Sequence, residues 1–153
     1  MALQRGDSGS TKYAPFTQID RDNVGDLRVA WHWKAVTSGS FPDYNYQVTP
    51  IMDDGVLYVS TGASEVAAVD ARTGETIWVF TPENSGNGRR PGSSGRGVAY
   101  WEDGSDRRIF HNSIDGRLFA IDANTGELSS EFGENGELID LLRECGNVVV
   151  VSP

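Results

Sequence analysis

Arginines and aromatic side chains gather between residues 89 and 101 of a chain that is otherwise acidic. Arg89, Arg90 and Arg96 are followed by Tyr100 and Trp101, whereas the 153-residue chain carries a formal net charge of -9. A guanidinium can bind a carboxylate through two parallel hydrogen bonds, so this cluster could hold a flat, anionic group. Solvated loop arginines would explain the same residues, and the composition leaves both interpretations open.

Other arrangements that carry chemistry are missing from the sequence. His32 and His111 lie in strand-like patterns without paired-histidine spacing, which favours packed or surface histidines over metal ligands. The stretch 86–91 starts like a dinucleotide-binding fingerprint but ends in proline, outside any strand-to-helix unit. No nucleophile is paired with a base. We therefore expect no catalytic residue and no metal ligand in this chain.

Composition narrows the possible partners. The pI of about 4.6 opposes binding to nucleic acid or to an anionic membrane surface. No run of about 18 apolar residues could span a membrane, and the first residues lack the apolar core of a secretory signal. Cys145 is the single cysteine, which excludes an internal disulfide.

An internal repeat provides the frame that must position the arginine cluster. The stretch Ala68-Val69-Asp70-Ala71-Arg72-Thr73-Gly74-Glu75 returns 52 residues later as Ala120-Ile121-Asp122-Ala123-Asn124-Thr125-Gly126-Glu127. In each copy we expect a tight turn, in which the Asp side chain accepts backbone N–H bonds and Gly takes the left-handed position. The chain therefore uses one supersecondary unit twice.

Each unit is predicted to be a sheet of short strands. Alternating apolar residues and Asp-Gly turns place the first unit at 47–80 and the second at 97–132. The predicted strands are 48–52, 56–61, 66–70 and 76–80 in the first unit, and 97–101, 107–112, 117–121 and 128–132 in the second. The segment between the units, 81–97, is long enough to favour a functional loop.

The flanks carry weaker patterns. Residues 20–27 resemble a short helical turn, and 27–33 alternate with period two, which predicts a strand with Trp31 and Trp33 on one face. A short helical stretch is expected at 137–144. The segments 27–36 and 147–153 are interpreted as strands of incomplete units. Because about three or more repeats are normally needed for stability, we expect the chain to be part of a larger protein.

Several motifs in their order along the chain resemble the N-terminal part of quinoprotein dehydrogenases that use pyrroloquinoline quinone (PQQ), most closely the glucose, quinate and alcohol dehydrogenases. The similar segments are 10–19, Leu27-Arg28-Val29-Ala30-Trp31, Val48-Thr49-Pro50-Ile51, Gly55-Val56-Leu57-Tyr58, the motif from Ala68 to Trp78, Arg96-Gly97-Val98-Ala99-Tyr100-Trp101 and Asp115-Gly116-Arg117-Leu118. The resemblance implies an all-β fold, as part of an eight-bladed β-propeller, with blades at 47–80 and 97–132 in a single domain covering 1–153. In that family a docking tryptophan stacks on a turn of the next blade. Trp78 matches this position and Ser130 departs from it.

The resemblance also implies a cofactor and a reaction. PQQ would lie in the central funnel with a calcium or magnesium ion, and an aspartate base would assist hydride transfer from an alcohol or sugar hydroxyl. Arg96 would contact PQQ, and Gln47 stands where many members have a PQQ-binding glutamate. The metal ligands and the base come from later blades, so this chain alone is expected not to catalyse the reaction.

The same resemblance implies a quinone or cytochrome electron acceptor, the remaining blades as partners, and a periplasmic or periplasm-facing location. Two other interpretations stay open. A non-catalytic PQQ-like propeller could serve as a protein-interaction scaffold, but it would have no reason to keep the Arg96 segment with Tyr100 and Trp101. The chain could also be the product of a truncated gene that never folds. In that case the purified 153 residues would show no cooperative unfolding transition.

Overall fold

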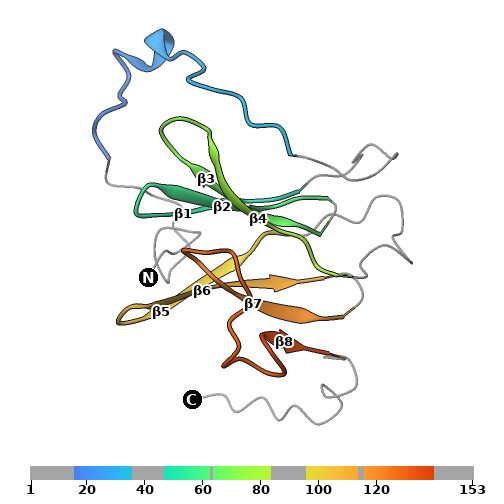
Figure 1. Ribbon diagram of the computed structural model, residues 1–153. Helices are drawn as coiled ribbons and strands as arrows, with labels where there is room; N and C mark the ends of the chain where they lie inside the picture. Colours follow the sequence, from blue (N-terminus) through green and yellow to red (C-terminus); the bar gives the residue numbers. More distant parts are fainter. Residues whose placement is uncertain (1–15, 36–46, 63, 84–95, 114–115, 140–153) are drawn as a thin grey trace, which may run out of the picture.

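The computed structural model describes residues 16–35, 47–62, 64–83, 96–113 and 116–139. Its strands form two antiparallel four-stranded sheets that lie one above the other (Figure 1). The first sheet contains β1 (Ile51–Asp53), β2 (Val56–Ser60), β3 (Val66–Asp70) and β4 (Thr76–Phe80), and the second contains β5 (Ala99–Asp103), β6 (Asp106–Asn112), β7 (Leu118–Asp122) and β8 (Glu137–Leu138). A 3-10 helix, η1 (Val24–Asp26), lies within the predicted helical turn. The predicted all-β fold is confirmed.

The repeated turns have the predicted geometry in both sheets. The Asp70 carboxylate accepts the backbone N–H groups of Arg72 and Thr73, each at 2.8 Å, and these bonds lower the pKa of Asp70. Gly74 has a φ of 75°, which glycine adopts without a steric penalty. Asp122 accepts the equivalent bonds in the second copy, at 2.8 and 2.9 Å. One local hydrogen-bond pattern therefore closes both hairpins.

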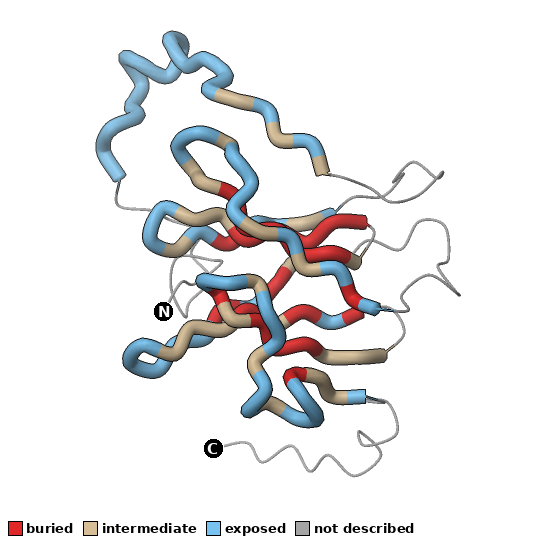
Figure 2. Tube along the Cα trace, viewed as in Figure 1, coloured by how far each residue is buried: buried red, intermediate tan, exposed pale blue. Residues whose placement is uncertain are grey.

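The main core lies between the two sheets (Figure 2). Each strand turns alternate side chains to this layer, as the pleat of a strand requires. The buried residues are Ile51, Tyr58, Val66, Ala68, Val98, Tyr100, Ile109, Phe119, Ile121 and Ala123. The aromatic rings of Phe80 and Phe119 meet across the layer with centroids 5.3 Å apart. Each sheet thus buries one face against the other.

Trp78 joins the two sheets in the way that the docking motif implied. Its indole lies against Gly126, so close that a Cβ on that glycine would fall 2.7 Å from the ring. The indole Nε1 also donates to the carbonyl of Ala123 at 3.0 Å. A side chain at position 126 would displace the indole, and the turn motif therefore serves as the seat for a tryptophan.

Trp31 makes the same joint one unit earlier, a role that the sequence interpretation missed. A Cβ on Gly74 would lie 2.7 Å from the Trp31 ring, and the Trp31 indole donates to the carbonyl of Ala71 at 3.2 Å. The prediction of a strand at 27–33 was wrong, because the described residues supply no neighbouring strand to complete a ladder. Burial still alternates there, since Trp31 and Trp33 are half-buried and His32 is exposed.

The second sheet differs from the predicted second unit at its fourth strand. Leu128 makes one isolated bridge to Ile121, and the chain then turns instead of continuing as a strand to residue 132. The backbone N–H of Phe132 donates to the carbonyl of Ser129 at 3.0 Å, which closes a turn inside the predicted strand. The strand position is filled by β8, so the predicted helix at 137–144 was wrong at its start. Its residues 140–144, like the predicted strand at 147–153, lie outside the described residues.

The faces of the sheets that point away from the core remain partly open. On the first sheet, Val59, Ala67 and Val69 form a smaller cluster covered by Trp33, Val48 and Leu57. Ile77 and Val79 alternate with core-facing residues of β4 and are 51% and 46% exposed. We call this surface the outer face of the first sheet. Among the described residues, no helix is long and apolar enough to cross a membrane.

Candidate functional site

The two residues that the resemblance placed at a cofactor lie on adjoining segments. Gln47 precedes β1 and Arg96 precedes β5, and an isolated parallel bridge joins Thr49 to Gly97. In a parallel pairing the residues before the bridge lie at the same end of both segments. Gln47 and Arg96 are both exposed. The segments that precede the first strands of the two sheets therefore lie side by side, and we refer to them as the edge formed by Gln47 and Arg96.

Gly97 allows the close approach of these two segments. Its φ of 123° lies in a region that residues with side chains rarely adopt, and an added Cβ would lie 3.2 Å from the carbonyl oxygen of Thr49. The segment carrying Arg96 is thereby held directly against the segment carrying Gln47. The other two arginines of the sequence cluster, Arg89 and Arg90, lie outside the described residues.

The aromatic pair after Arg96 does not form a single surface with it. Tyr100 is buried between the sheets and donates its hydroxyl hydrogen to the Glu102 carboxylate at 3.0 Å. Burial, reinforced by the Asp53 and Glu102 carboxylates, raises the pKa of Tyr100. Trp101 points to the opposite face, where the Arg108 guanidinium lies 5.3 Å from the ring centroid. Tyr100 thus belongs to the core, and Trp101 to the open face of the second sheet.

His111 lies at the same end of the sheets and is only 1% exposed. Its Nε2 is 3.1 Å from the carbonyl oxygen of Ser64, in the turn between β2 and β3 of the other sheet. Since a carbonyl only accepts, the ring proton resides on Nε2. Burial lowers the pKa of His111 to about 4, although the backbone of Ser64 and of Gly97 favours the protonated ring. The sequence favoured a packed or surface histidine here over a metal ligand, and its partners were not predicted.

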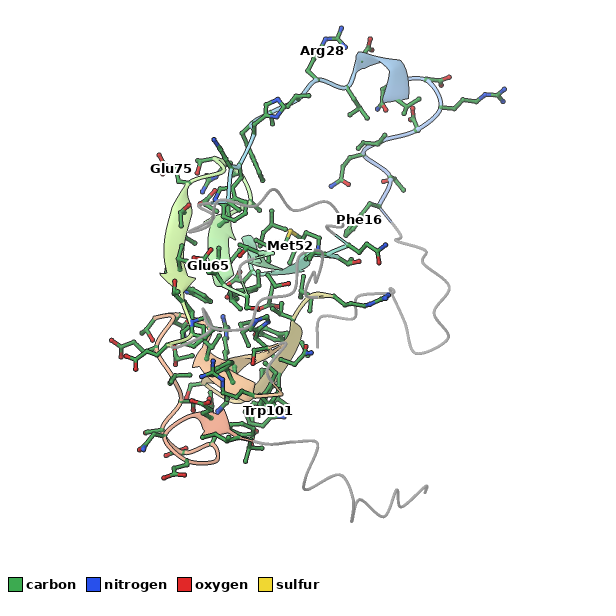
Figure 3. All side chains as sticks on the ribbon, turned by 90° about the vertical axis from the view of Figure 1, so that its right-hand side faces the viewer. Phe16, Arg28, Met52, Glu65, Glu75 and Trp101 are labelled. Atoms are coloured by element: carbon green, nitrogen blue, oxygen red, sulfur yellow. The ribbon has the colours of Figure 1, made fainter. Side chains whose placement is uncertain are left out.

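Two further charged residues stand at this end of the sheets. Glu65 is 4% exposed, and its carboxylate accepts the hydroxyl hydrogen of Thr61 at 3.2 Å. Figure 3 shows Glu65 and Glu75 at opposite ends of the β3–β4 hairpin. Arg117 pairs with Glu137 at 3.2 Å and donates to the carbonyl of Glu83 at 3.0 Å. These contacts fix β8 and the residues after β4 to the start of β7.

A pocket opens between the sheets at the end where the Asp70 and Asp122 turns lie. It is lined by Trp78 and by residues of the adjacent turns, and the Arg107 guanidinium lies 3.8 Å from the Asp54 carboxylate beside it. Because Arg96 precedes β5, whereas Arg107 follows the β5–β6 turn, the pocket is at the opposite end of the sheets from Arg96. It belongs to the Trp78 joint and not to the edge formed by Gln47 and Arg96.

Comparison with known proteins shows which family the chain belongs to. The family model described as "Glucose/ethanol/alcohol dehydrogenase, beta-propeller domain", with the short name PQQ, matches residues 3–151. The chain belongs to this PQQ β-propeller family. The two sheets are therefore part of a β-propeller, as the repeat and the docking tryptophan predicted.

Individual relatives agree with this family membership. The chain is 38% identical over 120 residues to the dehydrogenase subunit of the alcohol dehydrogenase (quinone) of Gluconacetobacter polyoxogenes, covering 76% of this chain and 15% of that protein. It is 36% identical over 137 residues to the 1-butanol dehydrogenase (cytochrome c) of Thauera butanivorans, covering 88% of this chain and 18% of the relative.

The fold is also found in a solved structure of the family. The quinohemoprotein alcohol dehydrogenase from Comamonas testosteroni superposes with a TM-score of 0.62 and 32% sequence identity, over 78% of this chain and 17% of that chain. The PQQ β-propeller family member described here thus spans less than a fifth of the length of these relatives.

Proposed function

We propose that the chain is the N-terminal segment of a longer PQQ-dependent dehydrogenase, which oxidises an alcohol or a sugar and passes the electrons to a quinone or a cytochrome. The relatives are named as alcohol dehydrogenases with quinone or cytochrome c acceptors, which supports this reaction. The observation that carries the proposal is the match of residues 3–151 to the propeller domain of these enzymes. The periplasm, or a membrane surface facing it, is the proposed location.

The edge formed by Gln47 and Arg96 fits an anionic, flat quinone. The Arg96 guanidinium supplies donors in a planar fork and a positive charge for a carboxylate. Gln47 supplies an amide that both donates and accepts hydrogen bonds. Both side chains are exposed on segments joined by the Thr49–Gly97 bridge. The residues present are therefore those that would hold one side of the cofactor.

In the proposed mechanism, residues of this chain bind PQQ, and residues of the remaining blades supply the metal ligands and the base. PQQ, when bound, would supply the hydride acceptor for oxidation of the substrate. A calcium or magnesium ion would accompany it, with ligands supplied by the remaining blades together with the base. The described residues contain no group of three or more His, Cys, Asp or Glu that could hold a metal ion. In this scheme the Arg96 guanidinium balances the negative charge of the cofactor, and Gln47 orients it through hydrogen bonds.

The remaining blades are the proposed partners of the open faces. Residues 47–80 and 97–132 are proposed as the two blades of this segment, the second extending to β8, and 27–36 as part of a neighbouring blade. The seat of Trp31 on Gly74 supports the last assignment, because it repeats the joint between the two complete sheets. The outer face of the first sheet would then pack against that blade.

Reconstitution of the full-length protein tests the proposal. Apo-protein supplied with PQQ and calcium should reduce an artificial dye when given an alcohol or a sugar. Arg96→Ala should weaken PQQ binding by about tenfold or more, the loss expected for one charge-assisted hydrogen bond. Arg28→Ala is the matched control, because Arg28 is an exposed arginine whose guanidinium donates to the carbonyls of Gly25 and Leu27 in its own loop. Absence of PQQ binding would favour the scaffold interpretation and overturn this one.

A further inference from the structure

The second sheet lacks both of the side-chain donors that the first sheet uses to bind its neighbour. In the joint between the two sheets, the Ala123 carbonyl accepts hydrogen bonds from the Trp78 indole at 3.0 Å and the Tyr58 hydroxyl at 3.3 Å. The 52-residue repeat places Ser130 and Phe110 at the corresponding positions of the second sheet. Phenylalanine has no polar hydrogen, and Ser130 lies in the turn that replaces the fourth strand. A joint on the open side of the second sheet therefore cannot repeat the first one.

Two other positions of the same face change in the opposite direction. Val56 of β2 corresponds to Arg108 of β6 by the same shift of 52 residues. Asp53 pairs with Val56 across the β1–β2 hairpin, beside the pocket that Trp78 lines. Trp101 pairs with Arg108 in the same way across the β5–β6 hairpin, so it corresponds to Asp53. Both exchanges put a large side chain with N–H donors where the first sheet has a small one without them.

Trp101 and Arg108 form one surface on the open face of the second sheet. Paired residues of neighbouring strands present their side chains on the same face, and the Arg108 guanidinium lies 5.3 Å from the centroid of the Trp101 ring. Its Nε donates to the Asp106 carboxylate at 3.0 Å, and its Nη2 donates to the Glu131 carboxylate at 3.2 Å. These bonds hold the guanidinium in place over the ring. We call the two side chains the Trp101–Arg108 surface.

The Trp101–Arg108 surface still has donors to offer. Within the described part of the chain, Nε1 of Trp101 and Nη1 of Arg108 have no hydrogen-bond partner. The positive charge of Arg108 is already balanced by the carboxylates of Asp106 and Glu131. A further carboxylate would be repelled by these two. The surface therefore suits a neutral acceptor, such as a backbone carbonyl.

A backbone carbonyl at one fixed position of the repeat already accepts an indole N–H in both copies. The Ala71 carbonyl accepts the Trp31 indole at 3.2 Å. The Ala123 carbonyl accepts the Trp78 indole at 3.0 Å. A further unit of the same kind would present the corresponding carbonyl to the open face of the second sheet. The repeat therefore indicates which partner the Trp101–Arg108 surface meets.

We infer that the Trp101–Arg108 surface receives the turn of the blade that follows this segment, and that it replaces the docking tryptophan missing at Ser130. The inference rests on the proposed function, because it requires the remaining blades of a longer propeller. Nε1 of Trp101 and Nη1 of Arg108 donate to the carbonyls of that turn. The two joints are thus built differently: the first uses a tryptophan of the fourth strand, and the second uses side chains of the first two strands.

Photo-crosslinking in the full-length protein identifies what covers this surface. The photoreactive amino acid p-benzoylphenylalanine replaces Trp101, and a control variant carries it in place of Arg72, on an exposed turn of the first sheet. After irradiation, peptide mass spectrometry should find cross-links from position 101 to residues beyond 153 of the same polypeptide, and none of these from position 72. Cross-links from position 101 that join two copies, or that reach only residues 1–153, overturn the inference, as does the absence of any cross-link.

Oxidative footprinting of the unmodified full-length protein gives the same test without a substitution. Trp101 is 42% exposed in this segment. If the next blade covers it, hydroxyl radicals should oxidise Trp101 no faster than the docked Trp78. Faster oxidation of Trp101 than of Trp78 would show that no blade covers the surface.

A pair of arginine substitutions tests the hydrogen-bonding role of Arg108. Arg108→Met keeps an unbranched apolar chain against Trp101 and removes the guanidinium. Arg107→Met is the matched control, because Arg107 is the preceding residue of β6 and lines the pocket between the two sheets instead. In the full-length protein, backbone amides beyond residue 153 that lie in the cross-linked peptides should exchange faster in Arg108→Met than in wild type. In Arg107→Met they should exchange as in wild type.

Equal exchange of these amides in Arg108→Met and Arg107→Met would overturn the role of Arg108. Titration of the same full-length protein with PQQ and calcium separates this inference from the proposed function. A protein that forms the cross-links from position 101 and binds no PQQ would refute the proposed function and leave the joint as inferred. A protein that binds PQQ without forming the cross-links would do the reverse.

Discussion

Two glycines, Gly126 and Gly55, have nearly the same backbone conformation and different surroundings. Their φ values are 78° and 79°, but a Cβ on Gly126 would lie 2.7 Å from the Trp78 ring, and a Cβ on Gly55 would meet nothing within 4 Å. A substitution at Gly55 therefore measures the cost of backbone strain alone, whereas the same substitution at Gly126 adds the cost of moving the Trp78 indole.

Alanine substitutions at these two positions should differ in cost. Gly55→Ala should destabilise the full-length protein by about 1 kcal/mol, because only the left-handed backbone is strained. Gly126→Ala should cost about 1–3 kcal/mol more, since the indole must also move. Thermal unfolding of both variants measures the difference. Equal losses at the two positions would contradict the seat described for Trp78.

The protonation of His111 predicts a pH dependence of stability. Its folded-state pKa of about 4 lies below the ordinary histidine value, so the folded protein binds fewer protons than the unfolded chain between pH 6.5 and 4. Stability is therefore complete above about pH 6.5 and falls as the pH is lowered, by at most about 3 kcal/mol. His111→Gln should show a smaller loss of melting temperature between pH 7 and pH 4.5. Parallel curves for the two proteins would contradict the shift.

At the scale of the element, the joint between sheets depends on a single indole. Trp78 is held by the Gly126 seat and by its bond to the Ala123 carbonyl, and its ring also lies 6.0 Å from that of Tyr58. Trp101 has a comparable side chain on a strand of the second sheet, but it is 42% exposed. Trp78 therefore joins the two sheets described here, whereas Trp101 lies on the face of the second sheet that a further blade would cover.

Trp78→Ala should destabilise the full-length protein by about 3–5 kcal/mol, the usual range for removing a large buried aromatic side chain. Trp78→Phe should recover most of the packing and lose about 1 kcal/mol for the indole bond. Gly55→Ala, which strains only its own backbone, is the control and should cost about 1 kcal/mol. Denaturant unfolding followed by circular dichroism measures all three. A Trp78→Ala loss no larger than that of Gly55→Ala would rule out the docking role.

Sequence patterns predicted the elements whose determinants are local. The Asp70–Gly74 turn forms through bonds within four residues, so its residues could be recognised without the fold. The same patterns failed where distant partners decide the outcome. Trp31 finds its carbonyl 40 residues away, and 27–33 alternates like a strand although the described part of the chain offers it no ladder.

The candidate site could be predicted only in part for a related reason. Gln47 and Arg96 remain predictions made from motif positions, and the pairing of their segments follows from a bridge between residues 49 and 97 that no local pattern encodes. His111 looked like any strand histidine, because its partner Ser64 is 47 residues away. Burial and hydrogen bonding between the sheets distinguish it, and these exist only in the folded molecule.

At the scale of the whole molecule, the outer face of the first sheet distinguishes a propeller segment from a self-contained domain. Val79 is 46% exposed here, because its alternating neighbours Trp78 and Phe80 face the core. In a closed ring this face would be covered by the preceding blade, and in a self-contained domain it would remain in water. The two arrangements therefore predict different surroundings for Val79 in the full-length protein: buried against a blade in a closed ring, and exposed to water in a self-contained domain.

Val79→Asp in the full-length protein should cost about 2–4 kcal/mol, since the substitution would place an unpaired carboxylate between blades. Arg72→Ala, on an exposed turn of the same sheet, should stay within about 0.5 kcal/mol of wild type. Thermal unfolding of both variants provides the comparison. A Val79→Asp protein as stable as wild type would mean that no blade covers this face.

The indoles of Trp31 and Trp78 bond to Ala71 and Ala123, carbonyls that lie 52 residues apart, at matching positions of the repeat. Neighbouring repeat units are thus joined by the same contact, in which a tryptophan of one unit packs on the glycine turn of the next. The first unit carries both the glycine turn that receives Trp31 and the tryptophan that packs on the next unit. Duplication of such a unit therefore copies both partners of the contact, and a propeller can gain blades without new contacts evolving between them.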